Sequence, residues 1–125
     1  MLIAVVGVCV AGKSTLVKGL REAGYDAYNV AQEHSCVKTF WNRRRPDLLI
    51  LLDVSLAAAK KRRAVTWDET RLQVQRERLA DARAHADLCI FTDPLSQEEV
   101  LQTVIRFIRG KKDDADHIAR PAERP

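Results

Sequence analysis

The sequence predicts an α/β fold in which helices cover both faces of a mostly parallel sheet of about four to five strands. Short apolar runs, of which residues 2–6 and 48–52 are the clearest, have the composition of strands that are buried on both faces. Segments with helical spacing of apolar residues alternate with such runs in the order β-α-β-α-β-α-α-β-α. Because right-handed crossovers put the connecting helices on both sides of a parallel sheet, this order predicts a three-layer αβα arrangement.

The first half of the chain contains three predicted strands and two predicted helices. Gly24 is suited to end the first helix, and Pro46 is suited to stop the second. The strands are expected at residues 2–6, 25–31 and 47–53, and the helices at 13–23 and 35–45.

Capping residues organise the second half. Ser55 is expected to cap a helix that ends in a basic cluster, and Thr66 with Glu69 forms a capping box for a long helix reaching about residue 84. Ser96 with Glu99 forms a second box. A last strand is expected at residues 86–92, and the inner face of the long helix at Leu72, Gln75, Leu79 and Ala82.

The length of 125 residues indicates one domain, which we assign to residues 1–110. Gly110 is expected to end the final helix, and residues 111–125 are polar and charged, which predicts a disordered tail. The longest apolar run, residues 48–52, is far shorter than the roughly 20 residues of a membrane span. We read no signal peptide at the start, and the three cysteines form no close pair, so we expect a cytoplasmic protein with reduced thiols.

The strongest functional signal is a complete match to the pattern G-x-x-x-x-G-K-[ST], the P-loop, between a predicted strand and a predicted helix. Glycines let the backbone curl so that N–H groups point at phosphate oxygens, and the following helix N-terminus favours an anion. Lys13 is expected to reach the β- and γ-phosphates and the Ser14 hydroxyl to ligate Mg²⁺. The predicted phosphate-binding residues are Gly7, Val8, Cys9, Val10, Ala11, Gly12, Lys13, Ser14 and Thr15.

The formal charge of +4 comes from local basic clusters at residues 43–45 and 60–63. Such clusters favour an anionic ligand, which can be a nucleotide or a nucleic acid. Since few aromatic residues are interleaved with them, we regard nucleic-acid binding as the weaker interpretation. The cluster at 43–45 either binds an anionic acceptor or merely ends a helix.

The P-loop, the strand that ends in Leu-Asp-Val-Ser at residues 52–55 and the basic segment after it resemble the P-loop kinases of small molecules, with nucleoside and nucleotide kinases nearest in pattern. The resemblance covers residues 1 to about 109. It implies ATP and Mg²⁺ as cofactors, a small-molecule phosphoryl acceptor, and a lid whose arginines close over the phosphates. Arg62 and Arg63 are the best matches to that lid, and Arg71, Arg76 and Arg78 lie in the same stretch.

Two carboxylates have alternative roles. Asp53 closes an apolar strand and either holds Mg²⁺ through water or caps the following turn. Glu33 follows the second strand, where the carboxyl ends of parallel strands gather around ligands, and is either a catalytic base, a partner of Mg²⁺-bound water or a solvated loop residue. His34 beside it is expected to be structural.

The sequence therefore predicts an ATP·Mg²⁺-binding protein that acts as a small-molecule kinase. Only residues 32–46 stand where such kinases insert an acceptor-binding segment, so a nucleotide-binding module without transfer chemistry is the alternative. A GTPase is less consistent with the sequence, because no Asn-Lys-x-Asp motif is present.

Overall fold

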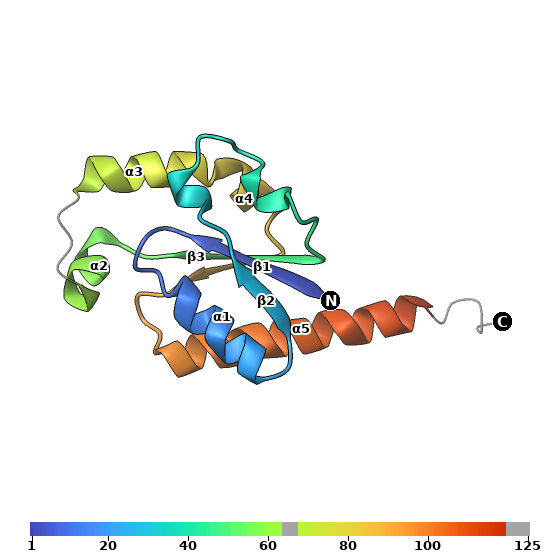
Figure 1. Cartoon of the computed structure of the whole chain (residues 1–125). Coiled ribbons are helices and arrows are strands. Elements are labelled where there is room, and N and C mark those ends of the chain that lie inside the picture. The colour runs from blue at the N-terminus through green and yellow to red at the C-terminus, as the bar shows by residue number, and fades with distance from the viewer. Residues whose placement is uncertain (64–67, 120–125) are drawn as a thin grey trace.

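The computed structural model describes residues 1–63 and 68–119, with side chains described as far as residue 111. Its centre is a four-stranded sheet in which every neighbouring pair of strands is parallel. The strands lie in the order β2-β1-β3-β4 (Figure 1). Their bounds are Leu2–Gly7 for β1, Asp26–Asn29 for β2, Leu48–Asp53 for β3 and Leu88–Phe91 for β4. The prediction of an α/β fold with a parallel sheet is confirmed.

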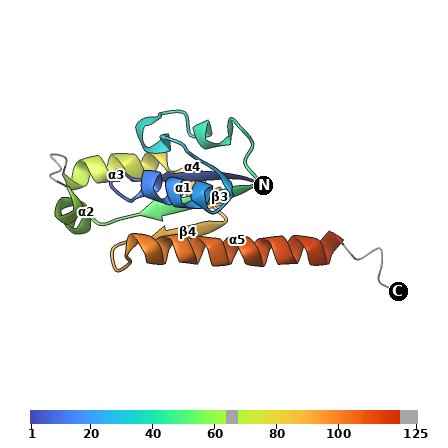
Figure 2. The ribbon, with the colours of Figure 1, turned by 60° about the horizontal axis from the view of Figure 1, so that its bottom comes forward.

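Helices cover both faces of this sheet. Figure 1 shows α1 and α5 together on one side, and α3 with α4 on the other. Figure 2 shows α5 as a long helix that runs beneath the sheet and continues past it. The helices are α1 Lys13–Glu22, α2 Leu56–Arg62, α3 Glu69–Arg78, α4 Ala80–His85 and α5 Gln97–Ala119. None of these helices is long and apolar enough to cross a membrane, as far as the described residues extend.

The core is aliphatic and centred on the two inner strands. Every residue of β1 from Ile3 onward and every residue of β3 before Asp53 is buried. This confirms that the continuous apolar runs mark strands covered on both faces, since a strand with one wet face would alternate. The register sets Gly7 beside Leu52, so the carboxyl ends of β1 and β3 finish at the same edge.

The predicted helix at residues 35–45 is wrong. One short 3₁₀ turn, η2 Phe40–Asn42, lies within that segment, and another, η1 Gln32–His34, lies just before it. The buried amide of Gln32 bonds the carbonyl of Val37 and accepts from the N–H of Trp41, at 2.8 Å each, so a side chain satisfies backbone groups that a helix would have paired. A single side chain thus fixes an irregular segment that the apolar spacing cannot reveal.

The long helix predicted to reach residue 84 is divided in two. Leu79 lies between α3 and α4, and its N–H is shared by the carbonyls of Gln75 and Arg76, each at 3.1 Å. Asp68 caps α3 by accepting from the N–H of Arg71 at 3.0 Å, whereas the predicted cap Thr66 and its neighbour Trp67 lie outside the described residues. The four predicted inner-face residues of this segment are all buried.

The other capping predictions are confirmed. Ser55 accepts from the N–H of Ala58 at 3.1 Å, and Ser96 and Glu99 exchange side-chain to backbone hydrogen bonds at the start of α5. The end of α5 differs from the prediction, because the helix continues through Gly110 to Ala119. A glycine inside a helix costs only about 1 kcal/mol relative to alanine, which is not enough to end a long helix by itself. Residues 111–119 are therefore helical in this structure, and residues 120–125 of the expected tail lie outside the described part.

Candidate functional site

The loop between β1 and α1 is shaped by two glycines that are needed for different reasons. Gly12 has φ of 103°, in the left-handed region, and a Cβ there would meet nothing within 4 Å among the described residues, so its role is conformational. A Cβ on Gly7 would lie 2.3 Å from the carbonyl oxygen of Leu52, so Gly7 is required by the close approach of β1 to β3. Val10 also has a positive φ, 69°. The loop curls tightly before α1 begins.

Lys13 is the first residue of α1, and its side chain is turned into the protein. Its Nζ donates to the carbonyl oxygens of Gly7 at 2.9 Å and Val8 at 3.2 Å, and lies 2.5 Å from Oε2 of Glu33. The Lys13 and Glu33 side chains are only 9% and 4% exposed, so they form a buried ion pair. The fold thus brings together two of the predicted catalytic residues, which are 20 positions apart in sequence.

Glu33 uses only part of its hydrogen-bonding capacity. It lies in η1, directly after the carboxyl end of β2, as the strand order predicts. Its Oε1 is buried and has no hydrogen-bond partner within the described part of the chain. A buried carboxylate oxygen without a partner is costly, which indicates a position suited to a further ligand.

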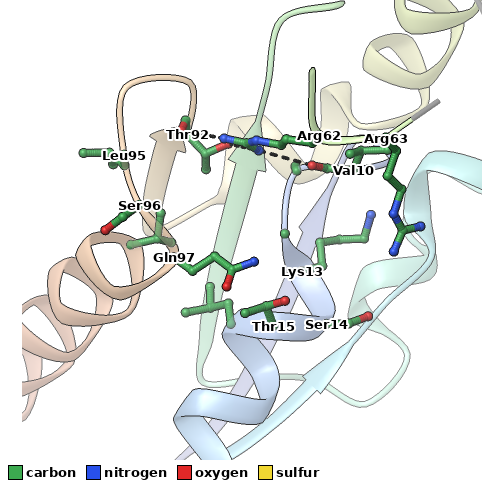
Figure 3. Close-up of a pocket in the computed structure, with 14 residues that line it drawn as sticks. Val10, Lys13, Ser14, Thr15, Arg62, Arg63, Thr92, Leu95, Ser96 and Gln97 are labelled. Atoms are coloured by element: carbon green, nitrogen blue, oxygen red, sulfur yellow. Dashed lines mark hydrogen bonds between the residues drawn. The ribbon is translucent and has the colours of Figure 1, made fainter. Parts of the chain in front are cut away.

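A cavity of about 520 Å³ opens on the other side of the loop. Figure 3 shows Lys13, Ser14 and Thr15 on one wall, Arg62 and Arg63 on another, and the segment between β4 and α5 on a third. Its lining residues are Val10, Ala11, Gly12, Lys13, Ser14, Thr15, Leu16, Arg62, Arg63, Thr92, Leu95, Ser96, Gln97 and Val100. The two best-matching lid arginines, Arg62 and Arg63, therefore share one cavity with most of the predicted phosphate-binding residues.

Arg62 joins the two sides of this cavity. Its guanidinium donates to the hydroxyl of Thr92 at 3.0 Å and to the Thr92 carbonyl at 2.8 Å, and also to the carbonyl of Val10 at 3.2 Å (Figure 3). The Thr92 hydroxyl in turn donates to the carbonyl of Asp53. The sequence did not single out Thr92, although its position just after the last strand, where ligand-binding residues gather in parallel sheets, was the available signal.

The other predicted lid arginines lie elsewhere. Arg76 contacts the Asp53 carboxylate, and Arg78 donates to the backbone carbonyl of Glu33 at 3.3 Å. Of the cluster at 43–45, Arg43 stacks on the ring of Phe40 and Arg44 on the ring of Tyr28. These arginines are engaged in packing the fold.

Ser14 and Asp53, the two predicted metal ligands, have different surroundings. The Ser14 hydroxyl lines the cavity and accepts from the amide of Asn29 at 3.2 Å. The Asp53 carboxylate accepts from its neighbour Val54 N–H at 2.8 Å and pairs with Arg83 at 3.0 Å as well as with Arg76. This geometry favours a structural role for Asp53, while a contact with Mg²⁺ through water stays a prediction.

Cys9 lies on the face of the loop that is turned toward η1. Its N–H donates to Oε1 of Gln75 at 2.8 Å, and its Sγ lies 3.2 Å from Nε2 of His34. Burial raises the pKa of the Cys9 thiol, and the negative charge of Glu33 raises it further. The contact between the Cys9 thiol and η1 could not be anticipated from the motif, since the pattern leaves that position free.

The sequence matches no model of a known protein family and none of the curated proteins. What the site can do must therefore be inferred from its geometry. It combines a helix N-terminus, a buried ammonium group paired with a carboxylate, and a cavity lined by two arginines, which together are suited to a polyanion.

Proposed function

We propose that this chain binds a nucleoside triphosphate with Mg²⁺ in the cavity beside the 7–15 loop and transfers its γ-phosphoryl group to a small molecule, as a cytoplasmic P-loop kinase does. The observation that carries the proposal is the position of Lys13. It lies at the start of α1, behind a loop with a left-handed glycine, and lines a cavity that also contains Arg62 and Arg63.

The phosphates would occupy the N-terminal end of α1. The first turn of a helix leaves N–H groups without intrahelical acceptors, and its positive dipole end attracts anions. Lys13 would exchange the Glu33 carboxylate for β- and γ-phosphate oxygens, so Glu33 would be its counter-ion in the empty site. The Ser14 hydroxyl would ligate Mg²⁺, which suits a hard oxygen ligand.

The rest of the nucleotide would extend toward the segment between β4 and α5. The cavity volume of about 520 Å³ falls within the roughly 300–1,000 Å³ of small-molecule sites. Arg62 is held in place by Thr92 and Val10, whereas Arg63 carries its guanidinium into the space beside Lys13 (Figure 3). Catalysis would depend on positioning and on the positive charges of Lys13, Mg²⁺ and Arg63.

Glu33 is the candidate base for an acceptor hydroxyl. Its carboxylate becomes available when Lys13 turns to the phosphates, which would link nucleotide binding to the readiness of the base. The proposal gives this role to Glu33 because it is the buried carboxylate nearest to Lys13.

The packing of residues 32–46 favours one alternative, a nucleotide-binding module without an acceptor. Gln32 is fully buried, and its amide bonds to backbone groups at Val37, Trp41 and Arg78. Trp41 is also tied to Asp81 through its indole N–H, at 2.8 Å. Gln32 and Trp41 therefore anchor this segment to the rest of the fold where an acceptor-binding insertion would stand.

Calorimetry of ATP·Mg²⁺ binding to Lys13→Ala tests nucleotide binding, which the kinase and the binding module have in common. We expect affinity to be lost, and to be retained in Lys18→Ala, which removes an exposed lysine from the same helix. The double variant Lys13→Met/Glu33→Gln repeats the test without leaving an unpaired buried charge. Unchanged affinity in these Lys13 variants would reject the proposal.

ADP formation then separates the two functions. A kinase produces ADP at a rate that rises with one acceptor in a panel of nucleosides, nucleotides and small metabolites, and Glu33→Gln lowers that rate. Background turnover with the whole panel, together with intact ATP binding, would favour the binding module.

A further inference from the structure

Three potential metal ligands converge beside the loop, next to the Lys13 ammonium group. They are the Cys9 thiol, the His34 imidazole and the Glu33 carboxylate, and one ligand atom from each lies within 4.8 Å of the others. Among the residues that line the cavity, none of these three occurs. We propose that they form a binding site for a divalent transition-metal ion, with Zn²⁺ as the best match.

Two of the three spacings between the ligand atoms are close to those of tetrahedral zinc, and the third, between Cys9 and Glu33, is no more than 4.8 Å. Zn–S bonds of about 2.3 Å and Zn–N or Zn–O bonds of about 2.0–2.2 Å put neighbouring ligand atoms about 3.4–3.6 Å apart. Cys9 Sγ lies 3.2 Å from His34 Nε2, and His34 Nε2 lies 3.7 Å from Glu33 Oε2. A shift of a few tenths of an ångström would fit these two pairs, and the Glu33 carboxylate would move closer to Cys9 as the ion binds.

The carboxylate provides an independent sign of a missing ligand. Glu33 is 3% exposed, and its Oε1 has no hydrogen-bond partner among the described residues, while Oε2 is held by Lys13. A rotation of the carboxylate would let a metal ion satisfy the unpaired Oε1, since the oxygen that lies 3.7 Å from His34 is Oε2, and the ion would add positive charge beside a buried carboxylate. The ion pair with Lys13 also holds the carboxylate in position, as partners of metal ligands commonly do.

The ligand types indicate which ions would bind. A thiolate and an imidazole favour Zn²⁺ and similar ions, whereas Mg²⁺ prefers oxygen ligands and would stay with the nucleotide. The side chain of His34 is 58% exposed, which gives the ion a path from solvent. Three protein ligands leave a fourth position for water. The thiol proton is displaced when the ion binds, so binding tightens as pH rises.

Titration of the nucleotide-free, full-length chain with Co²⁺ at mildly alkaline pH tests the proposal. Co²⁺ substitutes for Zn²⁺ and gives a sulfur-to-cobalt charge-transfer absorption only when a thiolate is bound. We expect this band to saturate at one equivalent and to disappear when Zn²⁺ is added, because Zn²⁺ binds such ligands more tightly than Co²⁺.

The chain supplies matched controls in its other two cysteines. Cys9→Ser should abolish the charge-transfer band. His34→Ala, a change at an exposed side chain, should weaken Co²⁺ binding by more than about tenfold. Cys36→Ser and Cys89→Ser, which remove exposed thiols, should leave the band unchanged. Circular dichroism reports whether each variant is folded. If Cys9→Ser unfolds, His34→Gln still tests the site, because it changes an exposed side chain.

The absence of a band in the native chain, or its persistence in Cys9→Ser or in both His34 variants, would overturn the assignment. A band lost in Cys36→Ser or Cys89→Ser would do the same, since it would place the ion elsewhere. Because no nucleotide is present, these results are independent of whether the chain binds ATP.

Discussion

The buried pair of Lys13 and Glu33 yields a prediction about stability that does not depend on any ligand. With 2.5 Å between Nζ and Oε2 and an effective dielectric constant of about 20, the attraction is about 7 kcal/mol before desolvation is counted. Desolvation of two buried charges offsets most of that attraction, so the net contribution of the intact pair is small. Removing one partner should destabilise the chain much more, because the other charge stays buried without its counter-ion.

The two single substitutions should differ in cost. Breaking a buried ion pair destabilises a protein by about 3–5 kcal/mol. In Glu33→Gln the ammonium group keeps the carbonyls of Gly7 and Val8 as acceptors, so we expect about 3 kcal/mol. In Lys13→Met the carboxylate loses its cation, and its Oε1 already lacks a partner in the described structure, so we expect about 5 kcal/mol.

The double variant Lys13→Met/Glu33→Gln should be within about 1–2 kcal/mol of the native chain, since neither charge remains. Urea denaturation of the four proteins without nucleotide gives the free energies of unfolding, and total stabilities of about 5–15 kcal/mol make the differences measurable. If the two single losses simply add in the double variant, or if each is below about 1 kcal/mol, the buried-pair reasoning is refuted.

Three further predictions follow from the fold. Gly7→Ala should destabilise the chain by about 3 kcal/mol or more in urea denaturation, because its Cβ would meet the Leu52 carbonyl at 2.3 Å. Gly110→Ala, whose Cβ has nothing within 4 Å in the described structure, should instead stabilise the chain slightly. If the two glycine substitutions changed the stability equally, the argument from the close contact at Gly7 would be contradicted. Ser55→Ala should cost about 1 kcal/mol in the same assay by removing the cap of α2, and no loss would mean that the cap is not formed. Because the pKa of the Cys9 thiol is raised, its thiolate fraction is lower at any given pH. Iodoacetamide should therefore label Cys9 more slowly than the two exposed cysteines, as measured by mass spectrometry, and faster labelling would contradict the raised pKa.

The fold could be predicted where apolar runs left a single interpretation. The strands around Val5 and Ile50 are apolar without interruption, as is typical of a strand that is covered on both faces. Both lie at the centre of the sheet. The helix caps at Ser55 and Ser96 could be identified because capping acts over three residues. The structure of the segment after β2 could not be predicted, because it depends on Gln32, whose hydrogen-bond partner Arg78 is 46 residues away.

The candidate site divides in the same way. The spacing of Gly7, Gly12 and Lys13 was sufficient to locate the loop between β1 and α1, since all three lie in one short stretch between a predicted strand and a predicted helix. The sequence also suggested Glu33 and Arg62, from strand order and from resemblance to kinases, but it gave them no partners.

By itself, the sequence determined the parallel α/β architecture and the position of the glycine-rich loop, because local periodicity and local turn chemistry specify both. Only the tertiary structure decided that Lys13 is paired with Glu33, that Arg62 is tied to Thr92, and that Cys9 faces His34. These contacts join segments that are 20 to 30 residues apart. They arise because parallel strands bring their carboxyl ends to one edge of the sheet, where side chains from separate loops meet.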